Sequence, residues 1–421
     1  MPPHPLNIRT PRVNLAPRFF PPPPRRELES SGAVDAVYVH VPFCTTKCHY
    51  CDFYSLAGHR HEAAAYLHVL RREARMQREY FGAPAPETIF VGGGTPTLLS
   101  PAHLASLLEI LLDAVDTSRL SEFTVEANPN TFDRPRARAL RAAGVNRISF
   151  GAQSFVPAEL QMLQRDHHPS SVPAAVDTAR AAGIARINVD LIFGIPGQTP
   201  ATLDLSLRRT LALEPEHVSC YNLVYEPNTP LTAARFRGRI QPVPEALELA
   251  LFEQVRNRLC EQGYYRYEIS NYARPGGECR HNIHCWRGGA YLGWGPSAAS
   301  HHSGFRWKNV ASLARYRDAL AAPAPRLPIV QMERLTGLAR WGELAMLQLR
   351  LREGLDYARF AEKTGVDAWK ILAPVRRKYE GLGVLADTPQ SLVLTDAAVA
   401  VSDTILADVL AAFYNPVGRA G

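Results

Sequence analysis

Three cysteines lie close together near the start of the chain, at Cys44, Cys48 and Cys51. This spacing can place three thiolate sulfurs on one short loop. Three thiolates can hold three irons of a cubane iron–sulfur cluster and leave the fourth iron open for a small molecule. A structural zinc site needs four ligands, which makes zinc the weaker alternative. The triplet therefore predicts a reactive iron–sulfur cluster.

The remaining cysteines do not suggest a disulfide framework. The chain has seven cysteines among 421 residues, an odd number and a low density compared with secreted domains that depend on disulfides. No apolar run has the length needed to cross a bilayer, and no signal-peptide core is evident. We therefore expect a cytoplasmic protein without a transmembrane segment, in a reducing compartment that suits an oxygen-sensitive cluster.

The formal charge of +7 raises the question of nucleic-acid binding. Only five of the 47 basic residues are lysine, and the arginines are dispersed along the sequence. Because nucleic-acid binding needs clustered positive charge, we expect no nucleic-acid partner. The arginines would instead suit a ligand that carries carboxylates.

Residues 1–32 differ from the rest of the chain in composition. They contain a run of four prolines followed by two arginines and have neither helical nor strand periodicity. Such a segment is typically disordered or polyproline-like. An organellar transit peptide is the alternative, which the prolines oppose because they prevent an amphipathic helix.

From residue 36 onward, short β-branched runs alternate with longer amphipathic stretches. We expect strands at 36–41, 88–91, 122–127, 147–152, 186–192 and 218–223. Helical patterns lie near 61–80, 101–115, 133–143, 157–164, 171–182 and 201–213. Repeated strand–helix units imply an α/β fold with a parallel sheet. Six units predict a partial (β/α)6 TIM-like barrel over residues 33–235, with a doubly wound sheet as the alternative.

The unusual polar and glycine-rich positions follow these strands, where parallel barrels gather their chemistry. The cysteine loop follows the first strand and glycines 92–94 follow the second, while Glu126, Gln153 and Asp190 lie in or after the next three. Taken singly, the glycines would form a flexible turn, Glu126 would cap a helix and Gln153 would be a satisfied amide. Asp190 lies inside an apolar strand and must find a partner. Together, these positions predict one site on one rim.

Several motifs resemble a known family. They are the run at 38–44, the cysteine triplet, the Gly-Gly-Gly-Thr-Pro run at 92–96 and the Val-Asp-Leu-Ile-Phe-Gly run at 189–194. The combination resembles the radical S-adenosylmethionine superfamily, in particular the branch of oxygen-independent coproporphyrinogen III oxidases and HemW-type heme chaperones. The resemblance covers residues 36–405.

The resemblance implies a 4Fe–4S cluster on the three cysteines and S-adenosylmethionine on the fourth iron. The positions that it implies for this cofactor are Tyr38, Tyr50, Gly93, Gly94, Thr95, Glu126, Gln153, Arg165 and Asp190. These residue types suit the task. Glycine allows close backbone approach, carboxylates accept hydrogen bonds from hydroxyl or ammonium groups, and arginine pairs with a carboxylate.

Two regions distinguish the oxidases from the heme chaperones within this branch. The oxidases carry a further cysteine two residues after the third, where this chain has Phe53, and their additional N-terminal substrate-binding segment has no evident counterpart. Residues 281–286 resemble a His-Asn-x-x-Tyr-Trp motif associated with heme, with Cys285 in the place of tyrosine. The resemblance implies His281 as a candidate heme ligand, and Cys285 is a further candidate. Cys279 and His284 are alternatives, and simple packing at a domain junction is the structural reading.

Residues 331–421 predict a smaller α+β domain, connected to the barrel by residues 236–330. We expect a long helix at 333–352, shorter helices at 357–363 and 368–380, and a hairpin formed by 384–386 and 392–395. Helices followed by a hairpin are typical of a winged helix, here expected to serve packing or interaction rather than DNA binding.

The resemblance thus implies a heme chaperone that binds heme, a 4Fe–4S cluster and S-adenosylmethionine and transfers heme to an acceptor protein. A membrane protein met only transiently is one expected class of acceptor. An oxygen-independent coproporphyrinogen III oxidase or another radical enzyme is the alternative, and the sequence leaves open whether the chain is an enzyme. A zinc-bearing binding module is the third reading.

Overall fold

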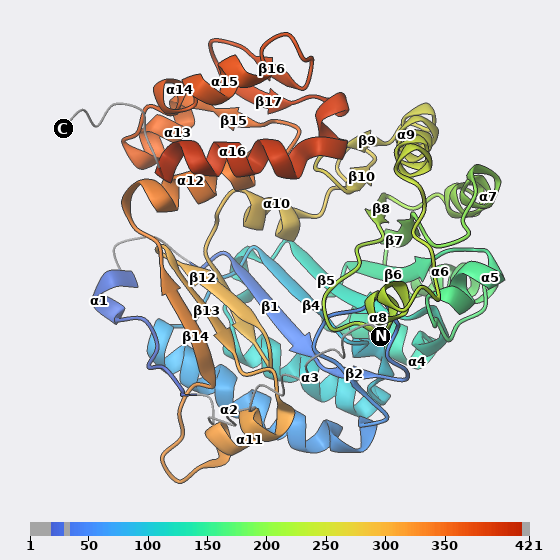
Figure 1. The fold of residues 1–421 in the computed structure, drawn as a ribbon. Coiled ribbons are helices and arrows are strands. Elements are labelled where there is room, and N and C mark those ends of the chain that lie inside the picture. Colours follow the sequence, from blue (N-terminus) through green and yellow to red (C-terminus); the bar gives the residue numbers. More distant parts are fainter. Residues whose placement is uncertain (1–17, 29–33, 415–421) are drawn as a thin grey trace, which may run out of the picture.

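The computed structural model describes residues 18–28 and 34–414 (Figure 1). At its centre, six strands pair in chain order, and each neighbouring pair is parallel. These strands are β1 (Ala36–Val41), β4 (Thr88–Gly93), β5 (Glu122–Ala127), β6 (Arg147–Gln153), β7 (Arg186–Phe193) and β8 (His217–Asn222). The expected partial barrel of parallel strands is confirmed.

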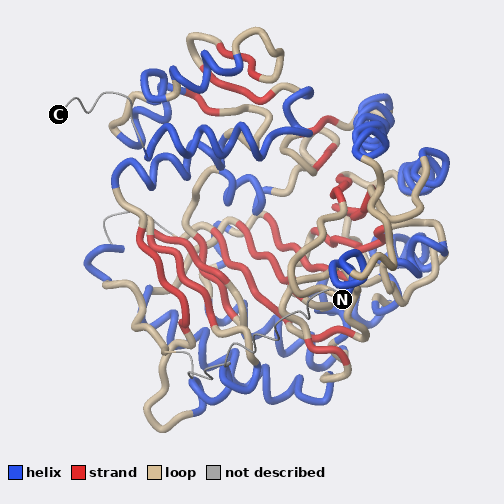
Figure 2. Tube along the Cα trace, in the orientation of Figure 1, coloured by secondary structure: helices blue, strands red, loops and turns tan. Residues whose placement is uncertain are grey.

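Helices alternate with these strands along the chain and lie outside the sheet (Figures 1 and 2). They are α2 (Ala63–Phe81), α3 (Pro101–Ala114), α4 (Arg134–Ala142), α5 (Pro157–Met162), α6 (Ser171–Ala181) and α7 (Pro200–Leu211). Local signals set their ends. Ser100 accepts a hydrogen bond from the backbone N–H of His103 and is followed by proline at the first helical position. Gly144 and Gly183 adopt positive φ just after α4 and α6, as helix C-termini favour.

The segment 236–330, which we expected only to connect two domains, extends the same sheet at both edges. β10 (Asn271–Ala273) and β9 (Tyr265–Arg266) add antiparallel strands beyond β8. On the other side β11 (Tyr291–Trp294) pairs parallel to β1, followed by antiparallel β12 (Ala299–His302), β13 (Phe305–Asn309) and β14 (Ile329–Arg334). Because added strands occupy both edges of the six-stranded unit, the barrel stays open. The sheet domain therefore reaches residue 334.

The expectation of an unstructured segment 1–32 does not hold for residues 18–28. A short helix, α1 (Arg25–Leu28), ends on a buried leucine. The hydroxyl of Tyr80 donates a 2.9 Å hydrogen bond to the carbonyl of Pro23. Proline has no N–H to satisfy, so an extended proline run can lie against a folded surface through its carbonyls. The rest of the predicted segment lies outside the described residues.

The C-terminal domain has its own hydrophobic core, formed within residues 344–413. Its elements are α12 (Gly337–Gln348), β15 (Leu355–Asp356), α13 (Tyr357–Thr364), α14 (Ala368–Ile371), α15 (Ala373–Tyr379), β16 (Leu385–Asp387), β17 (Ser391–Leu394) and α16 (Ser402–Tyr414). The predicted order of helices followed by a hairpin is confirmed. The expected helix at 333–352 is wrong at both ends, because residues 333 and 334 pair in β14 and the helix stops at residue 348.

The expectation that no apolar run could cross a bilayer is wrong for one stretch of the described chain, 396–414, which is long and apolar enough by length and composition. Its α16 portion packs beside α12, with Ile405, Val409 and Phe413 fully buried (Figure 1). A Cβ added to Gly342 of α12 would lie 2.7 Å from the Cβ of Phe413, which shows how closely the two helices approach. The apolar face of α16 is therefore part of a protein core.

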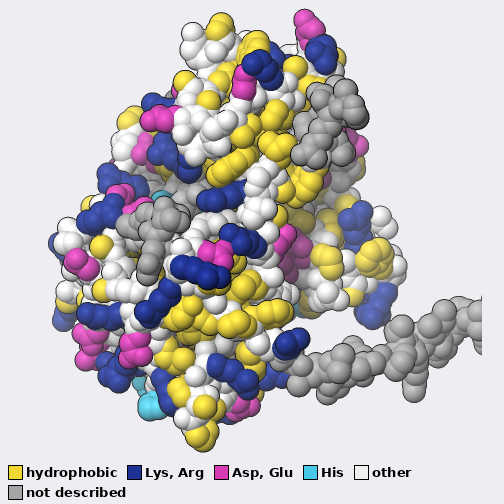
Figure 3. All heavy atoms as spheres, turned by 90° about the vertical axis from the view of Figure 1, so that its left-hand side faces the viewer, with side chains coloured by type: hydrophobic (Ala, Val, Ile, Leu, Met, Phe, Trp, Pro, Cys, Tyr) yellow, Lys and Arg dark blue, Asp and Glu magenta, His cyan; other side chains and the backbone are white. Residues whose placement is uncertain are grey.

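Basic side chains lie among acidic ones on part of the surface (Figure 3). Figure 3 shows one face on which Lys and Arg side chains are interspersed with Asp, Glu and apolar side chains. Arg119, for example, forms ion pairs with Asp35 at 2.8 Å and with Glu87 at 2.6 Å. On this face the basic residues form no continuous stripe.

Candidate functional site

A cavity of about 440 Å³ opens at the carboxyl ends of the central strands. Cys51 lines this cavity, together with ten further residues that the sequence predicted for the cluster and the cofactor. They are Cys44, Cys48, Tyr50, Gly93, Gly94, Thr95, Glu126, Gln153, Arg165 and Asp190. The parallel arrangement brings these strand ends to one rim. The structure thus gathers in one place nearly the whole predicted cluster and cofactor site.

The cysteine loop is held at both ends. β2 (Phe43–Cys44) pairs with β3 (Leu56–Ala57), which closes the loop. The backbone N–H of Thr95 donates a 2.7 Å hydrogen bond to the carbonyl of Phe43, which ties the loop to the glycine-rich turn after β4. The positions of the three thiols therefore depend on the barrel rather than on the loop alone.

The arrangement of the thiols favours a multi-iron cluster over a single ion. Three sulfurs on one zinc ion would lie about 3.8 Å apart. Among the described residues, one group has all of its ligand atoms within 4.8 Å of one another, and that group lies elsewhere and contains no cysteine. The three cysteine sulfurs therefore do not all lie within that distance of one another. The cavity lining includes these three cysteines and no fourth. The donor set therefore fits a cluster with one open metal position.

Two of the three cysteine sulfurs have a side-chain hydrogen-bond donor nearby. The Arg165 guanidinium lies 3.5 Å from the sulfur of Cys48, and the Thr95 hydroxyl lies 3.8 Å from that of Cys44. Burial, reinforced by the nearby Cys48, raises the pKa of Cys44 and raises the pKa of Cys51 to about 11. A metal would reverse this effect because a coordinating thiol loses its proton outright.

The glycine-rich turn lies too close to its surroundings for any side chain. Gly93 has φ of +104°, and an added Cβ would lie 2.5 Å from the ring of His40. A Cβ on Gly94 would lie 2.6 Å from the carbonyl oxygen of Phe43, next to the first cysteine. The turn therefore presents bare backbone to the cavity.

Replacing Gly94 by alanine is expected to displace the Phe43 carbonyl and lower the unfolding free energy by about 1–3 kcal/mol, as overpacking does. S-adenosylmethionine binding, measured by equilibrium dialysis, should weaken with it. Gly144→Ala is the control outside the cavity, because an added Cβ there would face open space and any loss of stability would come from the positive φ of that glycine alone. Equal cofactor binding by both variants would contradict this role of the turn.

Two partly buried carboxylates line the cavity. The Oε2 atom of Glu126 accepts a 3.0 Å hydrogen bond from the backbone N–H of Gly93. Asp190 accepts hydrogen bonds from Ser149 at 3.0 Å and from Asn188 at 2.8 Å. Burial, reinforced by the nearby Asp190, raises the pKa of Glu126 to about 7, and burial raises the pKa of Asp190. The pair can accept hydrogen bonds from hydroxyl or ammonium groups of a ligand.

The raised pKa of Glu126 has a consequence for stability. Its ordinary pKa is 4.5, so the folded state holds the proton more tightly than the unfolded state. The resulting stability is fully present below pH 4.5 and is lost as the pH rises through 7.

We therefore expect the ligand-free protein to lose stability between pH 5 and pH 8, and Glu126→Gln to lose about 1–3 kcal/mol less than the wild type. Buried Glu73 has a pKa raised to about 7 by burial and contributes the same trend in both proteins. Urea unfolding at the two pH values measures the difference. Parallel declines in the two proteins would contradict the assignment.

Gln153 and Arg165 are positioned by an irregularity in β6. The register between β6 and β7 shifts between Gly151 and Gln153, and Gln153 adopts φ of +63°, rare for a residue with a side chain. The Arg165 guanidinium donates a 2.6 Å hydrogen bond to the carbonyl of Gly151. Bulges of this kind re-aim side chains next to active sites.

Tyr38 differs from the other predicted cofactor residues, because it does not line the cavity. Its hydroxyl lies 3.1 Å from Nδ1 of His40, and its ring stacks on Phe90, which does line the cavity. Tyr38 therefore packs against a residue of the cavity lining and is not itself part of that lining.

Sequence reasoning missed several polar residues that also line the cavity. They are Arg147 and Ser149 of β6, Asn188 of β7, and Ser219 and Tyr221 of β8. Arg147 and Ser149 lie six and four residues before Gln153, Asn188 lies two residues before Asp190, and Ser219 and Tyr221 lie on the strand next to that of Asp190. Because side chains at every second strand position share a face, counting back in twos from Gln153 and Asp190 could have found the first three.

The proposed heme residues lie at the opposite end of the barrel, on α10 (Arg280–Trp286) (Figure 1). Nδ1 of His281 lies 2.9 Å from the hydroxyl of Thr88, the first residue of β4, whereas the cysteine loop follows the last residue of β1. Strands of six residues separate these two ends by about 17 Å. Burial lowers the pKa of His281 to about 4 and raises that of Cys285 to about 12. Neither residue lines the cavity, although Asn282 does.

Known proteins match both parts of the chain. A model of the radical SAM superfamily matches residues 38–209, and a model of the HemN C-terminal domain matches residues 335–401. A solved structure of coproporphyrinogen III oxidase (HemN) from Escherichia coli is similar in fold, with a TM-score of 0.75, 23% identity and 90% of each chain covered.

Two curated relatives are similar over nearly their whole length. The heme chaperone HemW of Bacillus subtilis is 35% identical over 86% of this chain and 95% of its own. The heme chaperone HemW of Mycobacterium tuberculosis is 37% identical over 87% of this chain and 94% of its own. Because of these relatives and the superfamily match, we conclude that the chain belongs to the radical SAM superfamily and, within it, to the HemW family.

Proposed function

We propose that this protein is a heme chaperone that binds heme, a 4Fe–4S cluster and S-adenosylmethionine and passes heme to an acceptor protein. The observation that carries the proposal is the similarity to proteins named heme chaperone HemW, which spans 94–95% of their length. The similarity therefore includes the cysteine cavity, α10 and the C-terminal domain together.

In this proposal Cys44, Cys48 and Cys51 ligate three irons of the cluster. The nearby guanidinium of Arg165 and hydroxyl of Thr95 would stabilise the anionic sulfurs by hydrogen bonding. When bound, the cluster would supply an open iron for the amino and carboxylate groups of S-adenosylmethionine.

The cavity residues have distinct proposed roles toward S-adenosylmethionine. Arg165 would pair with its carboxylate, and the backbone of the glycine-rich turn would contact its methionine part. Glu126 and Asp190 would accept hydrogen bonds from its hydroxyl or ammonium groups. Tyr50, Gly93, Gly94, Thr95 and Gln153 complete the proposed lining, with Tyr38 supporting it through Phe90.

His281 and Cys285 remain the proposed candidates for heme iron. Thr88 engages Nδ1 of His281, and within the described residues no hydrogen bond involves Nε2, which leaves Nε2 as the atom to bind iron. A neutral imidazole is a good axial donor, and burial keeps this one neutral by lowering its pKa. Heme at α10 would lie about one strand length from the cluster.

Heme titration of the cluster-loaded protein tests these candidates. His281→Ala is expected to weaken heme binding at least tenfold and to change the Soret band, because an iron ligand is lost. Cys285→Ser tests the second candidate in the same way. His103→Ala and Cys260→Ser are controls outside α10 and the cavity. Unchanged heme affinity in both α10 variants would remove this motif from the heme site.

The alternative function is that of an oxygen-independent coproporphyrinogen III oxidase. The similarity of fold to HemN favours it, whereas Phe53 in place of a further cysteine opposes it. Phe53 is 62% exposed beside the cavity that it lines. An anaerobic assay with coproporphyrinogen, reductant and S-adenosylmethionine is expected to yield no decarboxylated product, and product formation would favour the alternative.

We also propose a cytoplasmic location, in keeping with an oxygen-sensitive cluster. The proposed acceptor is a heme-binding protein, with a membrane protein met transiently as one class, and we propose no nucleic-acid partner.

A further inference from the structure

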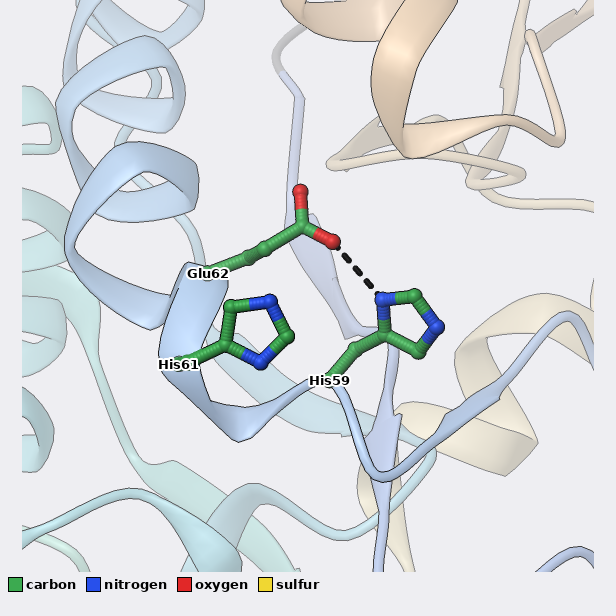
Figure 4. A group of neighbouring side chains, drawn as sticks. All are labelled: His59, His61 and Glu62. Atoms are coloured by element: carbon green, nitrogen blue, oxygen red, sulfur yellow. Dashed lines mark hydrogen bonds and ion pairs between the residues drawn. The ribbon is translucent and has the colours of Figure 1, made fainter.

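A second group of metal-binding side chains lies outside the cavity, at the start of α2. His59, His61 and Glu62 lie in and just before the short 3-10 turn η2 (Arg60–Glu62). One ligand atom of each lies within 4.8 Å of the others. Figure 4 shows the two imidazole rings side by side and the Glu62 carboxylate turned toward His59. None of the three lines the cavity.

The spacing in this group suits a single ion. Two ligands at tetrahedral angles about 2.0–2.1 Å from zinc lie roughly 3.3 Å apart. Nδ1 of His59 already lies 2.7 Å from Oε1 of Glu62, and the rings of His59 and His61 stack with centroids 5.7 Å apart. Small side-chain rotations would therefore bring all three ligand atoms around one centre.

The ligand types select the class of ion. Two imidazole nitrogens and one carboxylate oxygen suit zinc and neighbouring transition metals, whereas magnesium and calcium prefer oxygen ligands alone. Three protein ligands leave one or more positions for water, as in open zinc sites.

The surrounding contacts hold the group in place. Oε2 of Glu62, the oxygen that does not contact His59, lies 3.5 Å from the Arg317 guanidinium. Such a contact behind a ligating carboxylate orients it. The backbone N–H of Gly58, the residue before His59, donates a 3.3 Å hydrogen bond to the carbonyl of Cys44. The group is thus anchored to α11 (Leu313–Ala321) and to the cysteine loop.

We propose that His59, His61 and Glu62 bind a divalent transition-metal ion of the zinc class, at a site separate from the iron–sulfur cluster. The simpler interpretation is an ion pair between His59 and Glu62 at the start of a helix. The two interpretations differ at His61, which contributes to the metal site but has no part in that ion pair. His61 is exposed, so its replacement should leave the fold intact.

The test is a zinc titration of the full, cluster-loaded chain in competition with a chromophoric chelator. Iron is measured in every sample to show that the cysteines still carry iron rather than zinc. Wild type is expected to bind one zinc ion per chain, and His61→Ala and His59→Ala should each bind it at least about tenfold more weakly. His68→Ala, an exposed histidine further along α2, should match the wild type.

Equal zinc affinity in wild type and His61→Ala would overturn the proposal, as would a wild type that takes up no zinc. Both outcomes are independent of heme binding, so the metal site can fail while the proposed chaperone function stands, and the reverse.

Discussion

Cys48→Ala is expected to abolish the iron–sulfur cluster. The cavity offers three cysteine sulfurs and no fourth cysteine to replace one of them. Loss of one thiolate would expose a second iron and also leave the Arg165 guanidinium, 3.5 Å from that sulfur, without its anionic partner. Anaerobic reconstitution followed by iron and acid-labile sulfide analysis measures the result. We expect less than a tenth of the wild-type iron.

Cys260→Ala is the matched control for this experiment. Cys260 is exposed on α9 (Glu245–Glu261) and does not line the cavity. The Cys260→Ala variant should therefore retain the full iron and sulfide content of the wild type. Wild-type iron in Cys48→Ala, or an equal loss in both variants, would show that the cluster is held elsewhere or that iron content reflects general damage.

Arg165→Ala is expected to cause the largest loss of S-adenosylmethionine binding among single changes outside the cysteines. Removing one partner of a buried charged hydrogen bond costs about 2–5 kcal/mol, which corresponds to at least about a 30-fold weaker affinity. The side chain also spans from the Gly151 carbonyl to Cys48, so its loss would loosen the bulge that carries Gln153.

Arg165→Lys separates charge from shape in this experiment. Lysine keeps the positive charge but cannot form the two-pronged contact of a guanidinium, so an intermediate affinity is expected. Equilibrium dialysis on samples of matched iron content measures binding to the cofactor rather than loss of the cluster. Affinity equal to wild type in Arg165→Ala would place the cofactor carboxylate away from this residue.

The central strands and the rim could be predicted because their signals are local. β-branched runs such as 186–192 mark buried parallel strands, and a residue such as Asp190 within one is conspicuous. Chain connectivity then places all strand ends together. The cysteine loop, the glycine turn and the two carboxylates were therefore predictable as one site.

Other features depend on contacts between distant parts of the chain. The bulge that re-aims Gln153 is a one-residue register shift, which the local pattern does not encode. β11 returns from residue 291 to pair with β1, and the helix before it brings His281 beside Thr88 at the far end of the barrel. Short strands such as β12 carry too few alternating residues to be distinguished from a loop.

The most direct test of the chaperone account is a heme titration of the anaerobically reconstituted wild-type chain, followed by gel filtration. The account predicts a saturable Soret change at one heme per chain, with heme and the full iron–sulfur content eluting together with the protein. Heme that fails to saturate and separates from a protein with an intact cluster would contradict it.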